Sequence, residues 1–270
     1  MADHELPPTL LVERRDHVLV LTLSRPERLN ALDASLRDGI PAALAEAQAD
    51  PDVRAVVLTG SGRGFSSGVD LSAGRPVDDT GAPVTADPLD ELGWVGRQAL
   101  AVFGCDKPTI AAVNGVAAGA GMSLALACDL RVGSPATRFR TVFLERNLSP
   151  DSGMSWFLPR IVGYSRAADL LFTSRDVDAD EAYRMGLLDR LVDEDALLDA
   201  AVDVASQIAA LPPLAMRSAK RVLQHNLGVD LEDGLRYEMA GLGYARKARN
   251  DAREAMASFR EKRPPHFTGT

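Results

Sequence analysis

The chain has 270 residues, of which 46% are apolar and 25% are charged, a composition typical of a globular protein with a sizeable core. Its net charge of −8 gives no overall field that attracts nucleic acid or an anionic membrane, so we expect neither partner. Cys105 and Cys128 form no Cys-x-x-Cys pair, which argues against a disulfide framework and a zinc site. The first residues lack the layout of a signal peptide. We therefore predict a cytoplasmic protein.

The first half of the chain alternates strands and helices. Residues 17–23 predict a strand, residues 34–49 a helix capped by Asp33, and residues 53–58 and 109–113 two buried strands. This alternation indicates mixed α/β architecture. Residues 72–90 are rich in Gly, Pro, Asp and Thr and predict a long mobile loop that serves as a lid.

The second half begins with predicted helices at 92–103 and 122–128 and a strand at 130–133. Residues 110–128 carry no charge, but Asn114 and several glycines interrupt them, so we expect a buried strand, a turn and a buried helix rather than a membrane span. Strands are expected to cease after Ala179. Helices are predicted at 196–210, 214–226, 231–244 and 252–260. The expected division is a core of residues 1–195 and a helical oligomerisation region of residues 196–270.

Two glycine-rich turns, at 57–71 and 109–123, each follow a short apolar run. Each could present one backbone N–H to a single oxygen, and two such donors make an oxyanion hole for an acyl thioester. A dinucleotide-binding Gly-x-Gly-x-x-Gly is ruled out, because Gly119 and Gly121 have no third glycine after them. The pair of turns thus predicts enolate chemistry.

An ordered set of motifs carries a resemblance to a known family. These motifs are Arg-Pro-Glu-Arg-Leu-Asn-Ala-Leu ending at 32, Gly-Phe-Ser-Ser-Gly-Val-Asp-Leu ending at 71, Lys-Pro-Thr-Ile-Ala-Ala-Val-Asn-Gly-Val-Ala-Ala-Gly-Ala-Gly ending at 121, Leu-Pro-Arg-Ile-Val-Gly ending at 163, and Phe-Arg-Glu-Lys-Arg-Pro-Pro ending at 265. Together they resemble the enoyl-CoA hydratase/isomerase (crotonase) family, over about residues 10–267. The last part is most similar to the epoxyphenylacetyl-CoA isomerase type.

The resemblance implies an α/β spiral of ββα units with a C-terminal helical trimerisation region. It also implies acyl-CoA thioester substrates, no metal or redox cofactor, and a homotrimer or dimer of trimers. The implied oxyanion donors are the N–H groups of Val69 and Ala120. The implied coenzyme A contacts are Arg28, Leu29, Ala31, Ser67, Gly68, Asp70, Leu71, Gly119 and Phe143, with Phe259 and Lys262 reaching the nucleotide phosphates from a neighbouring subunit.

The chain departs from this family where hydratases carry two glutamates. Ser123 and Phe143 occupy those places, and neither can act as a carboxylate base. Glu145 could substitute only if the backbone shifted. Asp151 matches a catalytic aspartate of several family members, and apolar neighbours (Phe143, Leu148, Met154, Trp156 and Phe157) would make it a stronger base. The competing interpretation is that Asp151 caps the following helix.

The predicted function is double-bond isomerisation through an enolate, with Asp151 moving the proton and Phe143 excluding water. Three alternatives stay open. The chain could hydrate an enoyl-CoA with Glu145 or Asp151, Asp151 could attack the substrate covalently, or the protein could bind acyl-CoA without turnover.

Overall fold

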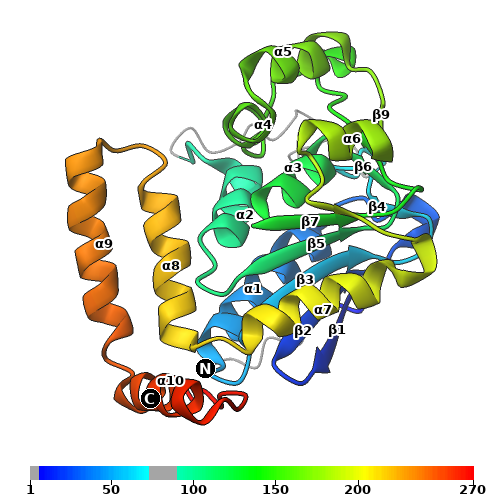
Figure 1. Cartoon of the computed structure of the whole chain (residues 1–270). Helices are drawn as coiled ribbons and strands as arrows, with labels where there is room; N and C mark the ends of the chain where they lie inside the picture. The colour runs from blue at the N-terminus through cyan, green and yellow to red at the C-terminus, as the bar shows by residue number, and fades with distance from the viewer. Residues whose placement is uncertain (1–5, 73–89) are drawn as a thin grey trace.

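The computed structural model describes residues 6–72 and 90–270. The predicted lid falls almost wholly on residues 73–89, outside this range. The chain runs four times through two strands and a helix, as β1-β2-α1, β3-β4-α2, β5-β6-α3 and β7-β8-α4 (Figure 1). This is the repeating ββα unit that the sequence resemblance implied.

The larger sheet has six strands, in the order β1 (Leu10–Arg15), β2 (Val18–Leu23), β3 (Ala55–Gly60), β5 (Thr109–Val113), β7 (Leu130–Gly133) and β10 (Arg190–Leu191). β1 and β2 pair antiparallel, and the other pairs are parallel. The expectation that strands cease after Ala179 is wrong, because β10 extends this sheet beside β7. A two-residue strand is too short to show a period of two in the sequence.

The smaller sheet has four short strands, in the order β4 (Gly64–Ser66), β6 (Val116–Ala118), β8 (Arg138–Arg140) and β9 (Val177–Asp178). β4, β6 and β8 are parallel, and β9 is antiparallel to β8. Each of these strands except β9 follows directly after a strand of the larger sheet. The chain therefore passes from one sheet to the other at each glycine-rich turn.

Helices cover both faces of the larger sheet, because successive strand residues point to opposite sides. One face packs against α1 (Ala34–Ala49), α2 (Gly93–Phe103) and α3 (Ala120–Ala127). The other face packs against α7 (Leu197–Ala209), which buries Leu197, Ala201 and Val204 on Val18, Val57 and their neighbours. The predicted Asp33 cap is confirmed, since its Oδ1 accepts the Leu36 N–H at 3.0 Å.

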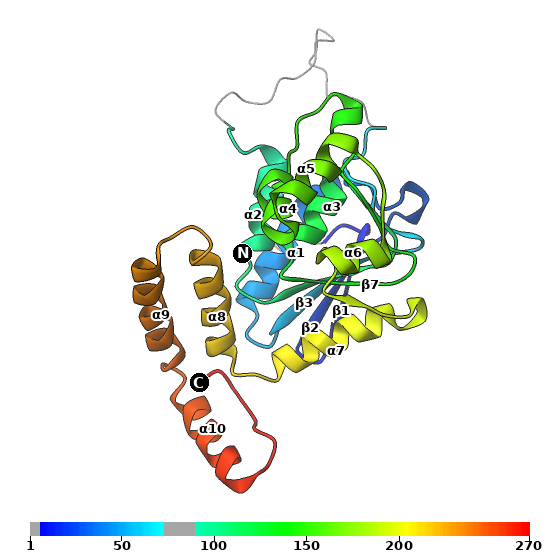
Figure 2. The same cartoon turned by 45° about the horizontal axis from the view of Figure 1, so that its top comes forward.

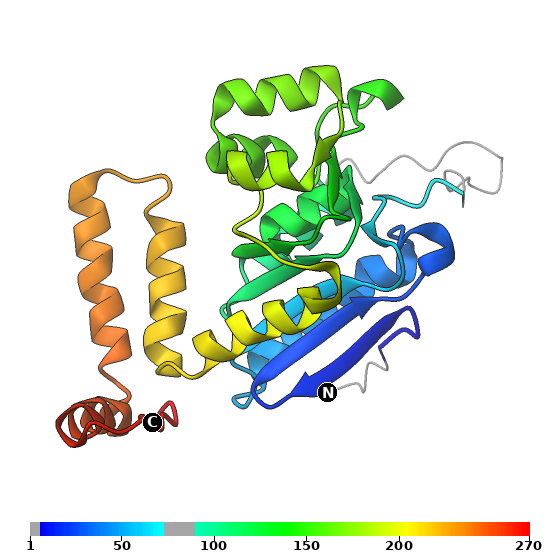
Figure 3. The same cartoon turned by 45° about the vertical axis from the view of Figure 1, so that its right-hand side comes forward.

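The remaining helices lie at the two ends of the molecule. α4 (Met154–Val162), α5 (Tyr164–Thr173) and α6 (Ala179–Met185) lie at the end that holds the smaller sheet (Figure 1). α8 (Pro213–His225) and α9 (Leu231–Ala245) form a hairpin beside the core, and α10 (Arg249–Glu261) lies across its lower end (Figures 2 and 3). Lys220 of α8 joins this hairpin to the core, because its Nζ lies 2.6 Å from Asp129 Oδ2.

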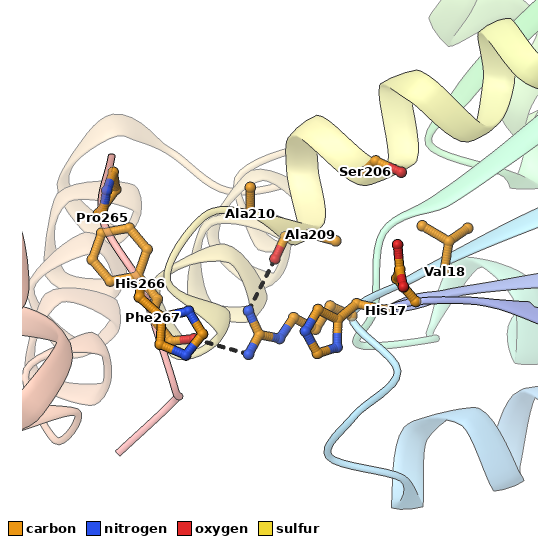
Figure 4. A pocket seen from close by; sticks show the side chains of 10 residues that line it. His17, Val18, Ser206, Ala209, Ala210, Pro265, His266 and Phe267 are labelled. Atoms are coloured by element: carbon orange, nitrogen blue, oxygen red, sulfur yellow. Dashed lines mark hydrogen bonds between the residues drawn. The ribbon is translucent and has the colours of Figure 1, made fainter. Parts of the chain in front are cut away.

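The segment after α10 returns to the core. Phe267 is buried there, and the Arg54 guanidinium donates to the carbonyls of Phe267 at 2.9 Å and Ala209 at 3.2 Å. Figure 4 shows these two hydrogen bonds in a cavity of about 250 Å³, which His17 and His266 also line. Because Ala209 ends α7, the Arg54 cation also offsets the negative end of that helix.

No individual helix in the described ranges combines the length and apolar character needed to cross a bilayer. Residues 194–209 and 213–225 meet the criterion only as a pair, with a bend of 106° between them.

Candidate active site

The first glycine-rich turn leads out of β4 and presents the amide of Val69. Leu32 donates its N–H to the Gly68 carbonyl at 2.7 Å and accepts the Asp70 N–H at 3.1 Å. Val69 lies between Gly68 and Asp70 in this parallel bridge to Leu32. Its own N–H therefore points away from Leu32. Gly68 adopts a φ of +91°, which a side-chain-bearing residue rarely does.

The second glycine-rich turn leads out of β6 and presents the amide of Ala120. Gly119, at a φ of +51°, donates its N–H to the Arg140 carbonyl at 3.0 Å, and α3 begins at Ala120. The helix predicted from Met122 thus begins two residues earlier in the structure. The Ala120 N–H belongs to the first helical turn, where amides have no acceptor within the helix. The positive end of the helix dipole favours negative charge there.

The two turns touch through their backbones. A methyl group on Gly68 would lie 2.8 Å from the Ala118 carbonyl oxygen and 3.3 Å from the Ala120 nitrogen. A methyl group on Gly121 would lie 2.2 Å from the Ser66 carbonyl oxygen. Glycine is therefore required at both positions by close approach.

Between the turns lies a cavity of about 40 Å³. Within the part of the chain that the structure describes, neither the Val69 nor the Ala120 amide donates to another protein group. Two free N–H donors on one cavity are the arrangement that an oxyanion hole needs. The residues lining the cavity are Ser67, Gly68, Val69, Leu71, Gly119, Ala120, Val142, Phe143, Arg146, Leu148 and Asp151.

Eight residues predicted from the sequence therefore meet at this cavity, including both amide donors and Asp151. Arg28 and Leu29 lie next to it, because the Ser67 N–H donates to the Leu29 carbonyl at 2.9 Å and Ser67 Oγ to the Arg28 carbonyl at 3.2 Å. Ala31 is buried beside them. Asp70 is not part of the cavity lining. Its Oδ2 lies 2.8 Å from Nη2 of Arg25.

Phe259 and Lys262 are not brought to this cavity within one chain. Phe259 is 82% exposed, and Lys262 ends α10 in the left-handed conformation. α10 lies at the opposite end of the molecule from α4 (Figures 1 and 3).

Asp151 is half-buried on the cavity wall and does not cap α4. The residue at the N-terminal cap of α4 is Gly153, and no side chain accepts from the first amides of that helix. The Asp151 carboxylate instead accepts a hydrogen bond from Ser152 Oγ at 2.8 Å. The capping interpretation is thus wrong, and the carboxylate is left available to the cavity.

The apolar surroundings of Asp151 differ in part from those expected. Phe143 and Leu148 line the same cavity, but Met154 is fully buried in the core. Trp156 and Phe157 line a separate cavity beside α8, where Trp156 meets Phe103 edge-on and Phe157 packs against it at a tilt. The side on which these rings pack depends on how α4 is oriented, which the sequence does not reveal.

The positions of the two hydratase glutamates hold no carboxylate. Ser123 is buried in α3, and its Oγ has no hydrogen-bond partner among the described residues. Phe143 is 4% exposed and lines the cavity. Glu145 is exposed, pairs with Arg140 at 2.6 Å and is absent from the cavity lining. It therefore does not substitute for the missing glutamates in this structure.

Sequence reasoning missed several residues that shape the site. Val142 and Arg146 line the cavity, and Val142 has a φ of +54°, an outlier for a β-branched residue that is typical of functional sites. Asn30, fully buried, donates to the Gly64 carbonyl at 2.7 Å, and its own carbonyl accepts Ser66 Oγ at 2.8 Å. Asn30 stood inside a motif matched to the family, which was the available signal for it.

The comparisons with known proteins agree with this geometry. The family model described as Enoyl-CoA hydratase/isomerase matches residues 13–270. The chain belongs to the enoyl-CoA hydratase/isomerase family. It is an enzyme of this family, and its fold is the crotonase fold.

Relatives named for different activities are about equally similar to this chain. The protein named probable enoyl-CoA hydratase echA12 from Mycobacterium bovis is 39% identical over 265 residues, covering 96% of this chain and 92% of that protein. The 1,2-epoxyphenylacetyl-CoA isomerase of Escherichia coli K12 is 35% identical over 259 residues, covering 93% of this chain and 95% of that protein. The crystal structure of an enoyl-CoA hydratase from Mycobacterium tuberculosis H37Rv superposes with a TM-score of 0.86 at 32% identity, covering 98% of this chain and 100% of that one. Overall similarity therefore identifies the family but does not choose between hydration and isomerisation.

Proposed function

We propose that this enzyme isomerises the double bond of an enoyl-CoA thioester through an enolate, with Asp151 as the base and acid. The observation that carries the proposal is that Asp151 is the single carboxylate among the described residues of a cavity that two free amides also line. One carboxylate is enough to take a proton from one carbon and return it to another.

For a 3-enoyl thioester, the Asp151 carboxylate removes a proton from C2. The electrons of that C–H bond form the C1–C2 double bond of an enolate, whose negative charge rests on the thioester oxygen. The amides of Val69 and Ala120 stabilise this oxygen. Protonated Asp151 then returns the proton at C4, the thioester carbonyl re-forms, and the double bond lies between C2 and C3. No metal or redox cofactor enters this step.

Hydration is the second candidate, because several relatives carry the name probable enoyl-CoA hydratase. It is disfavoured by Ser123 and Phe143 at the two glutamate positions, since syn addition of water needs a carboxylate to hold and deprotonate that water. Phe143 instead places an apolar ring on the cavity wall.

The test is a panel of 2-enoyl, 3-enoyl and ring-epoxide CoA thioesters incubated with the enzyme in heavy water and followed by mass spectrometry. We expect isomerisation without a net gain of water, and deuterium enters the product at C4 in those turnovers in which protonated Asp151 exchanges with solvent before it returns the proton. A mass increase of one heavy-water molecule identifies a hydratase and overturns the proposal. Binding of every thioester without exchange or turnover indicates a catalytically silent acyl-CoA binder.

We further propose that the enzyme assembles as a homotrimer or a dimer of trimers. α9 carries one stripe of exposed apolar side chains, Leu231 (78% exposed), Leu235 (50%), Met239 (66%) and Leu242 (43%). Their spacing places them on one face of the helix, and a stripe of this kind marks an interaction surface. A neighbouring copy on this side could also bring Phe259 and Lys262 to the coenzyme A phosphates.

Replacing both Leu235 and Met239 by Asp tests this assembly. We expect sedimentation to show a monomer at concentrations where the wild type is trimeric, because two buried charges would oppose association. Ala240→Asp, which adds a charge at an exposed position of the same helix outside the stripe, is the matched control. A double variant that sediments like the wild type contradicts the proposed interface.

A further inference from the structure

Ser152 has an unusual backbone for its residue type. It adopts a φ of +54°, a left-handed conformation that glycine tolerates and serine rarely adopts. Gly153 follows with a φ of +82°, so two successive left-handed residues connect the cavity wall to α4. Ser152 is also 8% exposed. Residues held in sparsely populated conformations cluster at functional sites.

The buried hydroxyl of Ser152 has one partner, which is the carboxylate of the preceding residue. Ser152 Oγ donates to Asp151 Oδ1 at 2.8 Å. Among residues 6–72 and 90–270, no other side chain or amide donates to that carboxylate, and no cation pairs with it. The backbone of Asp151 is held separately, because its carbonyl accepts the Met154 N–H at 2.9 Å.

A carboxylate held by one donor has a defined orientation. The terminal torsion of an aspartate is broad and roughly two-fold, so a free carboxylate samples many orientations. The hydroxyl of Ser152 occupies Oδ1 and leaves Oδ2 for the reacting carbon.

We propose that Ser152 is a positioning residue that orients Asp151 for proton transfer. The inference rests on the proposed function, because Ser152 acts only through Asp151, the base proposed there. Ser152 itself is assigned no contact with the substrate. A purely structural role in starting α4 does not account for the geometry, since Ser152 Oγ makes no hydrogen bond to an amide of that helix. The left-handed conformation of Ser152 brings its hydroxyl to the carboxylate of its own neighbour.

The test compares Ser152→Ala with Ser152→Gly. Both remove the hydroxyl, but alanine keeps the backbone strain while glycine relieves it. We expect kcat to fall roughly tenfold in both variants, because a misoriented base lowers the rate of proton transfer. KM is expected to stay within about twofold, since the substrate-binding groups are unchanged. Ser155→Ala, an exposed serine in the first turn of α4, is the matched control and keeps the wild-type kcat.

Three outcomes decide the inference. A parallel loss of kcat in the alanine and glycine variants, with KM and the melting temperature of the glycine variant near wild type, supports it. A kcat within twofold of wild type in the glycine variant overturns it and assigns the effect of alanine to backbone strain. A rise of KM by the same factor in the alanine and glycine variants, without loss of kcat, also overturns it, because that pattern indicates a role in binding.

Asp151→Asn is assayed beside these variants to separate the two proposals. If Asp151→Asn is inactive and Ser152→Gly is fully active, the proposed function stands and the positioning role fails. If Asp151→Asn keeps wild-type turnover, the proposed function fails, and the positioning role fails with it.

Discussion

The two walls of the cavity are built in different ways. One wall consists of backbone amides at Val69 and Ala120. Each follows a glycine with positive φ, and these glycines are hydrogen-bonded to the backbones of Leu32 and Arg140. The other wall consists of side chains from residues 142–151, where Leu144 to Ser149 are exposed and only a single turn of 3-10 helix, Leu144–Arg146, is regular. The first wall depends on backbone shape, and the second depends on which side chains it carries.

This difference explains why similarity alone does not settle the reaction. A backbone donor keeps its chemistry when its own side chain changes, so a wall of backbone amides can serve hydratases and isomerases alike. The side-chain wall changes chemistry with one substitution. Phe143 and Asp151 therefore say more about the reaction of this enzyme than its 39% or 35% identity to a named relative.

The largest effect is expected for Asp151→Asn, which changes the side-chain wall alone. The amide is nearly isosteric with the carboxylate but cannot accept the proton, so we expect turnover to fall by roughly 10³-fold. Affinity for a saturated acyl-CoA thioester should stay within a few-fold, because the amide donors are intact. Turnover is measured by mass spectrometry and affinity by calorimetry. Retained turnover would remove Asp151 from the mechanism.

A smaller effect is expected for Gly68→Ala, which changes the backbone wall alone. The new methyl group would lie against the Ala118 carbonyl, at a φ that alanine rarely adopts. Displacing the Val69 amide should lower kcat by roughly 10²-fold, as loss of one oxyanion donor does.

The control for this change is Gly228→Ala. No atom lies within 4 Å of a methyl group at Gly228, so wild-type kcat is expected there. Equal kcat in the Gly68 and Gly228 variants would contradict the oxyanion role of the first turn.

The same contrast marks what the sequence could predict. The glycine turns were predictable, because a motif of glycines after a buried strand reports a local backbone requirement. So were the Asp33 cap and the long helices, which depend on near neighbours. The three-residue strands β4, β6 and β8 were not, since they show no period of their own. Val142 and Arg146 were missed because the irregular segment that carries them is shaped by tertiary contacts.

The orientation of α4 shows the same limit. Its sequence predicted aromatic residues near Asp151, yet Trp156 and Phe157 pack toward Phe103 and α8. Periodicity identifies which residues share a helix face but not the partner that the face contacts. That Asp151 lines the cavity was predictable from its motif, whereas its hydrogen bond from Ser152 is visible only in the structure.

The smallest effect concerns the support of the backbone wall at Asp70. Hydrogen bonds from Ser72, through Oγ at 2.6 Å and the amide at 2.9 Å, lower the pKa of Asp70 to about 2, with help from Arg25 at 2.8 Å. A carboxylate whose pKa is lowered on folding from 3.8 stabilises the folded state above about pH 4, and this contribution is lost as the pH falls toward 2. Because Ser72 is exposed, we expect solvent screening to limit it to about 1 kcal/mol.

Urea unfolding of the wild type and Asp70→Asn between pH 2.5 and 6 isolates this contribution. The wild type should be more stable at pH 6, and the difference in free energy of unfolding should shrink steadily below pH 4, because other acidic groups titrate equally in both proteins. A difference that stays constant across this range would mean that the charge of Asp70 does not stabilise the turn that presents Val69. In that case the backbone hydrogen bonds of Leu32 to Gly68 and Asp70 hold the turn without help from the carboxylate, and kcat at neutral pH should be the same in the two proteins.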